Sequence, residues 1–358
     1  MPFYIGIVLI TTLLAWIYEY SKDKIAKKVL FAVLVLFPST LSGLRGVGTD
    51  ILHYIWYDNE IINGTYELVD YKSIFVQITR LLLELNVPFQ LILFTVSVIT
   101  IYIVFKVFSS FERNISFTFA VFSYMLIFYQ MSFNTYRQIM AAAFFLLATI
   151  ALFKEENKKN FILLWIISVL IHSSLLPFGL IYFFEDLITS KKYRKTRVLI
   201  YMLGTIFIFL IPYTTNRMDD LLSIIPHYGW YITRFSQREI GFGIMRFFVM
   251  AIVPLIFIKK KDIDKDLTDK KMSFLPFYIS MGFILWLTSY ISDSSLYRVS
   301  FNMLIALPLF HGYFFSKLIK SRIIIQLAII GIMVLFWYYD GAIINTGETV
   351  PYRFCWEI

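Results

Sequence analysis

Long apolar runs, separated by short lysine-rich segments, follow one another along the whole chain; Phe3–Tyr20 and Phe89–Val107 are typical. About 20 apolar residues cross a bilayer as an α-helix, and only helices and closed barrels satisfy their backbone hydrogen bonds there. Hydrophobic residues make up 59% of the chain and charged residues 16%, whereas soluble domains carry about 25% charged residues. The sequence therefore predicts an all-α, polytopic membrane protein, with about 12 transmembrane helices bundled into a single transmembrane domain over residues 1–358.

Two apolar segments do not fit a simple crossing. The segment 73–85 is short and contains Arg80 and Glu84, so we interpret it as an interfacial or re-entrant helix. The segment 161–187 is long for one helix and short for two, and the polar break IHSSLLP interrupts it at His172. Because basic stretches flank it on both sides, it is predicted to be a hairpin of broken helices with His172 near its outer apex.

The distribution of basic residues predicts the orientation, because lysine and arginine accumulate in cytoplasmic loops. No basic residue precedes Phe3–Tyr20, and SKDKIAKK follows it at once. This run is therefore expected to be a retained helix that starts outside the cytoplasm, not a cleavable signal peptide. The alternation of loops then places both termini outside, with two large outer loops at 45–72 and 214–241. The net charge of +9 is explained in the same way and does not indicate a nucleic-acid partner.

Lysine and arginine are distributed differently across this predicted topology. Every lysine except Lys72 falls on the cytoplasmic side, whereas most arginines are outer or membrane-embedded. The arginine fork suits phosphate and carboxylate groups and always keeps its charge. The outer face is therefore expected to handle an anionic, phosphorylated ligand. The sequence contains no metal-binding motif and implies no cofactor, and its single cysteine, Cys355, excludes an internal disulfide.

Four stretches bring polar residues to the predicted outer ends of spans. One is NTYRQIMAAA, which is expected to open a span at Asn134 with Arg137 and Gln138 on the same helical face. An ionisable side chain in a span is costly unless it faces a partner or a wet cavity, so Arg137 is interpreted as functional; the alternative is an arginine that reaches the headgroups. The stretches LRGVGTDILHY, IHSS and DSSLYRVSF supply the other candidate site residues: Arg45, Gly48, Asp50, Tyr54, His172, Tyr297 and Arg298.

The outer loop 214–241 runs into the aromatic and basic stretch HYGWYITRFSQREIGF. Aromatic rings stack on sugar faces, and Arg234 and Arg238 would share a helical face. This stretch is either a lid that contacts a glycan or an amphipathic interfacial helix whose rings belong to the aromatic belt.

The motifs RGVGTDILHY, NTYRQIMAAAF, IHSSLL, LYRVSF and VPYRF, in this order, resemble the EpsG-like branch of the Wzy-type polysaccharide polymerases. The resemblance implies a bacterial inner-membrane enzyme of O-antigen, capsule or exopolysaccharide synthesis, with its active site facing the periplasm. The loop charges place both termini on the same side. Such an enzyme transfers a growing glycan from undecaprenyl pyrophosphate to a hydroxyl of a lipid-linked repeat unit. The implied partners are the lipid-linked donor, the lipid-linked acceptor and membrane lipid. A chain-length regulator is a further expected partner, although no residue of the sequence points to it.

The residue chemistry agrees with this reaction, because a departing pyrophosphate gains charge that arginines stabilise. Arg137 and Arg298 are the first candidates for that role, and Arg45 is the next. His172 has a suitable acidity to act as general base towards the acceptor hydroxyl. Asp50 is the alternative base, or it orients an arginine.

Three other functions are compatible with a polar outer face. An O-antigen ligase would use similar arginines and a histidine, and only the order of the motifs favours the polymerase. In a flippase for lipid-linked oligosaccharides, the arginines would line a translocation path; however, the charged positions cluster at one face and no internal repeat is found. An acyltransferase could use His172, but it would leave the arginines unexplained.

Overall fold

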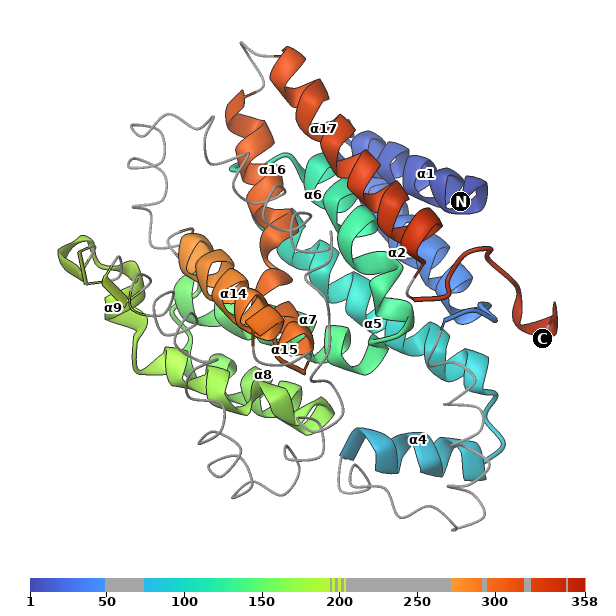
Figure 1. Ribbon diagram of the computed structural model, residues 1–358, viewed down its shortest axis with the longest axis horizontal. Helices are drawn as coiled ribbons and strands as arrows, with labels where there is room; N and C mark the ends of the chain where they lie inside the picture. The colour runs from blue at the N-terminus through green and yellow to red at the C-terminus, as the bar shows by residue number, and fades with distance from the viewer. Residues whose placement is uncertain are drawn as a thin grey trace. The chain divides into compact units, whose positions relative to one another are not determined.

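The computed structural model describes residues 1–48, 74–193, 274–291, 295–318, 323–345 and 347–357, together with Met272 and a few positions between 195 and 203. These residues form helices α1 (Pro2–Tyr20), α2 (Lys24–Gly43), α4 (Ile74–Glu84), α5 (Phe89–Ser109), α6 (Phe117–Tyr124), α7 (Tyr136–Phe153), α8 (Lys158–Ile171), α9 (Glu185–Thr189), α14 (Phe274–Ile291), α15 (Ser295–Leu304), α16 (Leu307–Leu318) and α17 (Ile323–Tyr338) (Figure 1). Over the described ranges there is no β-strand, only an isolated antiparallel bridge between Arg45 and Phe354. The predicted all-α fold is confirmed.

Several of these helices can cross a membrane. Within the described ranges six segments are long and apolar enough: Pro2–Tyr20, Lys24–Gly43, Phe89–Ser109, Tyr136–Phe153, Arg298–Lys317 and Ile323–Ile344. The membrane character of the chain is thus confirmed, and the helix count agrees approximately with the prediction. The predicted outer loop 45–72 beyond Gly48, and the whole of 214–241, lie outside the described residues.

The chain divides into two compact units. The first comprises Met1–Leu147, Leu164–Ser173 and Pro308–Ile358, and the second comprises Ala148–Leu163 and Ser174–Leu307. The single transmembrane domain expected for the whole chain stays a prediction, because a division by internal packing does not define a membrane domain.

The first unit is held together by close helix packing with a few buried polar contacts. Helix α1 packs against α2 and α6, and α2 packs against α5 (Figure 1). The hydroxyls of Ser42 on α2 and Ser97 on α5 lie 2.7 Å apart. On α16, the fully buried His311 bonds through Nδ1 to the Ser123 hydroxyl of α6 at 2.6 Å. Small and hydroxyl-bearing residues at such crossings let membrane helices approach closely and pair their polar groups.

The second unit has a core of aliphatic and aromatic side chains. Helix α14 packs against α15, and the Thr149 and Tyr278 hydroxyls bond to each other inside it. The rings of Phe153 and Phe274 stack with their centroids 5.7 Å apart. The amide of the buried Asn302 donates to the Ser174 hydroxyl at 3.0 Å.

Both segments predicted to be irregular are irregular. Helix α4 has 11 residues, too few to span a bilayer, and Arg80 and Glu84 neutralise each other on it at 2.7 Å. Helix α8 ends at Ile171, and after His172 the chain continues as a 3-10 helix over Ser173–Tyr182.

The chain enters α7 differently from the prediction. Helix α6 continues as a π-helix over Met125–Tyr129 and then as a 3-10 turn over Met131–Phe133. Helix α7 begins at Tyr136, so Asn134 precedes the helix and was wrongly placed in its first turn. The physical reason is that the backbone N–H groups of Asn134 and Thr135 both bond back to the Met131 carbonyl, at 3.2 Å each, which closes the preceding turn.

Candidate functional site

The candidate site is built around a buried arginine at the end of α2. Arg45 follows the last turn of α2 and is only 1% exposed. Its guanidinium donates to the carbonyl and hydroxyl of Ser42 and, at 3.2 Å, to the carbonyl of Phe133. It also lies over the Phe133 ring, 4.7 Å from the centroid. Arg45 therefore joins the end of α2 to the turn that precedes α7.

Arg45 brings a positive charge into the protein. Burial lowers the pKa of Arg45 to about 10, so the side chain stays charged at neutral pH. Within the described residues no carboxylate forms an ion pair with it, and its Nε has no hydrogen-bond partner. A buried charge without a counter-ion favours a nearby anion.

The C-terminal tail closes over this arginine. The N–H of Gly46 bonds to the carbonyl of Arg353 at 2.8 Å, and the N–H of Cys355 bonds to the carbonyl of Leu44 at 2.9 Å. The hydroxyl of Tyr352 donates to the Leu41 carbonyl at 2.6 Å. Figure 1 shows this tail leaving α17 and running past the end of α2. The structure thus brings the VPYRF motif beside the RGVG motif, although they lie at opposite ends of the sequence.

Asn134 connects the same tail to the start of α7. Its amide nitrogen donates to the carbonyl of Gly347 at 3.0 Å, while its buried Oδ1 has no partner among the described residues. Two glycines make room for this amide. A Cβ at Gly48, whose φ is +117°, would lie 2.5 Å from Oδ1, and a Cβ at Gly347 would lie 2.8 Å from Nδ2. Gly48 thus lets the backbone approach a side chain; its approach to a ligand stays a prediction.

Gly48→Ala is expected to destabilise this site. A side chain at positive φ costs about 1–2 kcal/mol, and the overlap with Asn134 adds about 1–3 kcal/mol. Thermal unfolding of the detergent-solubilised protein measures the loss. Gly331→Ala on α17 is the matched control, because a Cβ there meets nothing within 4 Å. Equal unfolding temperatures for the two variants would contradict the close approach described here.

Arg137 and Gln138 lie in the first turn of α7, just after Asn134. Gln138 is 4% exposed and Arg137 is half-buried. The amino end of a helix carries a partial positive charge and attracts anions, so Arg137 adds a positive charge where the helix already favours an anion. The first unit therefore concentrates positive charge at the start of α7.

The remaining predicted site residues are divided between the two compact units and the part of the chain that is not described. His172 is half-buried at the break after α8 and belongs to the same compact unit as Arg45, Asn134 and Arg137. Arg298 is exposed on α15, which belongs to the second unit and also contains Tyr297. The other predicted site residues lie outside the described residues: Asp50, Tyr54, Arg234 and Arg238. In the part of the chain that the structure describes, no cluster of His, Cys, Asp and Glu could hold a metal ion.

Sequence reasoning missed the residues that hold the tail in place. Gln130 accepts from the Trp337 indole at 2.5 Å and donates to the Thr349 hydroxyl at 3.3 Å. Tyr4 donates to the carbonyl of Thr349 at 2.7 Å. A glutamine at the end of the apolar run Phe117–Met131 was the available signal, because a polar side chain at that depth needs a partner.

Comparison with known proteins relates the chain to a protein family. A family model described as the EpsG family matches residues 28–354, which include Arg45, Asn134, Arg137 and the tail up to Phe354. No curated protein and no solved structure matches the chain.

Proposed function

The chain belongs to the EpsG family, and from this premise we propose that it is a polymerase for undecaprenyl-pyrophosphate-linked oligosaccharide repeat units. Membership in the family indicates a function of the polysaccharide-polymerase type in the membrane. The proposal adds the donor, the acceptor and the face of the membrane. The growing glycan passes to a hydroxyl of the incoming repeat unit on the periplasmic face of the inner membrane, and undecaprenyl pyrophosphate is released.

The observation that carries this proposal is the concentration of positive charge at the start of α7. Arg45 is a buried cation without a carboxylate partner in the described residues, and Arg137 lies at the amino end of a candidate span. A lipid-linked pyrophosphate needs this arrangement, because its charge sits at the membrane boundary while its tail stays in the bilayer. Arginine suits it better than lysine, since the planar fork bonds two phosphate oxygens.

The proposed reaction is a displacement at the anomeric carbon of the donor. The acceptor oxygen forms the new glycosidic bond, and the bond to the pyrophosphate oxygen breaks with its electron pair. The acceptor proton passes to His172, with Asp50 as the alternative base. Arg137 stabilises the additional negative charge on the pyrophosphate, and Arg298 is the second candidate for this role.

The proposed orientation follows from the loop charges. Both termini and the loop 45–72 face the periplasm, and a chain-length regulator is the expected protein partner. A positively charged site on that face meets the repeat units after they have crossed the membrane.

Purified protein in nanodiscs should convert synthetic undecaprenyl-pyrophosphate repeat units into a ladder of lipid-linked polymers. The products are separated by gel and identified by mass, because each transfer adds one repeat unit. Transfer of glycan to lipid A, without a ladder, would support the ligase instead. Movement of repeat units across the bilayer without any new glycosidic bond would support the flippase. Either result would overturn the polymerase proposal.

A further inference from the structure

A cavity lined by lysines lies at the opposite end of α2 from Arg45. It has a volume of about 210 Å³ and is lined by Tyr18, Lys27, Lys28, Phe31, Lys106 and Ser109, from α1, α2 and α5. Helix α2 has 20 residues and so is about 30 Å long, which separates this cavity from the candidate polymerase site. The volume is several times the roughly 30 Å³ of a water molecule, enough for a phosphate group with part of its hydration.

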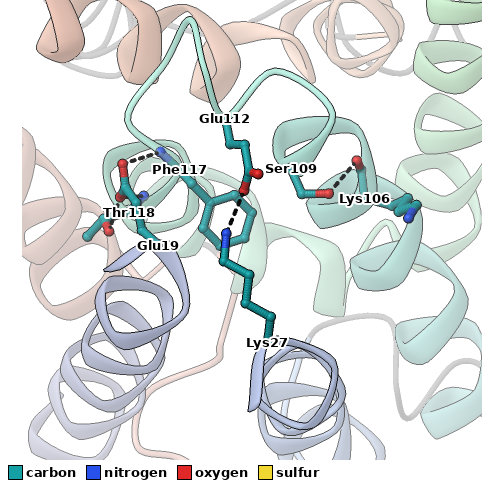
Figure 2. Close-up of polar contacts among 7 residues, drawn as sticks. All are labelled: Glu19, Lys27, Lys106, Ser109, Glu112, Phe117 and Thr118. Carbon is teal, nitrogen blue, oxygen red and sulfur yellow. Dashed lines mark hydrogen bonds and ion pairs between the residues drawn. The ribbon is translucent and has the colours of Figure 1, made fainter. Parts of the chain in front are cut away.

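The carboxylates around this cavity already have partners, as Figure 2 shows for two of them. Glu112 pairs with Lys27 at 3.2 Å. Glu19 accepts from the backbone N–H groups of Phe117 and Thr118, at 3.3 and 2.8 Å, and so caps α6. Asp23, which is not drawn, caps α2 in the same way by accepting from Ala26 at 2.6 Å.

Two lysines of the cavity are left without such a partner. Within the described residues neither Lys28 nor Lys106 forms an ion pair. At the end of α5 the Ser109 hydroxyl donates to the backbone carbonyl of Lys106 at 2.9 Å (Figure 2). With Lys27 paired to Glu112, the cavity keeps two positive charges. We propose that it binds the phosphate of an anionic membrane phospholipid.

The surroundings favour a lipid over a soluble phosphate compound. The cavity lies at the ends of three candidate membrane spans, at the level where headgroups lie. One helical turn from Lys106, Tyr102 is 48% exposed, and its ring meets the Phe31 ring edge-on at 5.9 Å. Val33 on α2 is also exposed, at 42%. A phospholipid would therefore place its phosphate between the lysines and its acyl chains against this apolar surface.

Native mass spectrometry of the detergent-purified protein tests the proposal, with phosphatidylglycerol as the probe. Each lysine beside an anionic lipid is worth about fivefold in affinity, so Lys28→Gln combined with Lys106→Gln should weaken binding by about 25-fold. Lys22→Gln combined with Lys24→Gln is the matched control: it removes the same charge from the same end of the molecule without touching the cavity lining. This control should keep nearly full affinity.

Additional variants and probes distinguish a lipid ligand from a soluble one and from a general effect of charge. Lys28→Arg combined with Lys106→Arg should retain binding, because both charges are kept. This variant also provides a test at the same two positions if the glutamine variant does not fold. Phosphatidylcholine should bind much more weakly than phosphatidylglycerol. Equal losses in the cavity and control variants would overturn the proposal. It would also be overturned if inorganic pyrophosphate bound to the wild-type cavity while phosphatidylglycerol did not, since the ligand would then be soluble. None of these results depends on polymerase activity.

Discussion

Arg137→Ala should lower the rate of polymer formation by about 10²–10³-fold, the usual loss when one donor is removed from a site that stabilises developing charge. Arg137→Lys should lose nearly as much, because lysine keeps the charge but cannot bond two phosphate oxygens with a planar fork. The measurement is the initial rate of ladder formation by purified variants on synthetic lipid-linked repeat units. This expectation rests on the position of Arg137, which lies in the first turn of α7 just after Asn134.

The comparison needs a control that separates this local role from a general change of charge. Arg113→Lys alters an exposed arginine in the turn between α5 and α6, at the other end of the first unit, and should retain the wild-type rate. Each variant is checked by thermal unfolding before its rate is measured. If folded Arg137→Ala made polymer at near-normal rate, Arg137 would be a helix anchor and the catalytic scheme would lose its main cation.

The helices were predictable from the sequence because their cause is local. An apolar run in a bilayer must form internal backbone hydrogen bonds, so its length and composition are sufficient to identify α1, α2 and α5. The break at His172 was predictable for a similar reason, since polar residues interrupted one apolar run. The start of α7 was not, because the Met131 carbonyl accepts from Asn134 and Thr135 and ends the preceding turn there. Hydrophobicity does not encode that choice.

The candidate site was only partly predictable, because its central contacts are distant in the sequence. The residue types of Arg45, Asn134 and Arg137 marked them individually as costly in a membrane. Nothing local indicated that the tail would bond to Gly46, or that the Gly347 carbonyl would accept from Asn134. Motif order suggested a shared purpose for these stretches, and the structure shows the contacts that join two of them.

Arg45→Ala should strongly destabilise the first unit. The side chain is 1% exposed, so its removal leaves a cavity beside Phe133 and leaves the carbonyls of Ser42 and Phe133 without this donor. Large-to-small changes in a core cost about 2–5 kcal/mol, and each unsatisfied buried acceptor adds about 1–3 kcal/mol. Removing a buried charge that has no counter-ion offsets part of this cost. We therefore expect a net loss of about 3–5 kcal/mol in the free energy of unfolding.

Thermal unfolding in detergent measures this loss, with Arg80→Ala as the matched control. Arg80 lies on helix α4, where its i,i+4 pair with Glu84 is partly solvent-exposed, and such pairs contribute about 0.3–0.5 kcal/mol. Arg45→Met refines the test, because methionine fills the space and removes the buried charge but donates no hydrogen bond. Its stability should lie between that of Arg45→Ala and that of the wild type. If Arg45→Met were at least as stable as the wild type, the hydrogen bonds to Ser42 and Phe133 would not hold this end of the molecule together. Arg45 would then be retained for its charge, and its place would be beside the pyrophosphate.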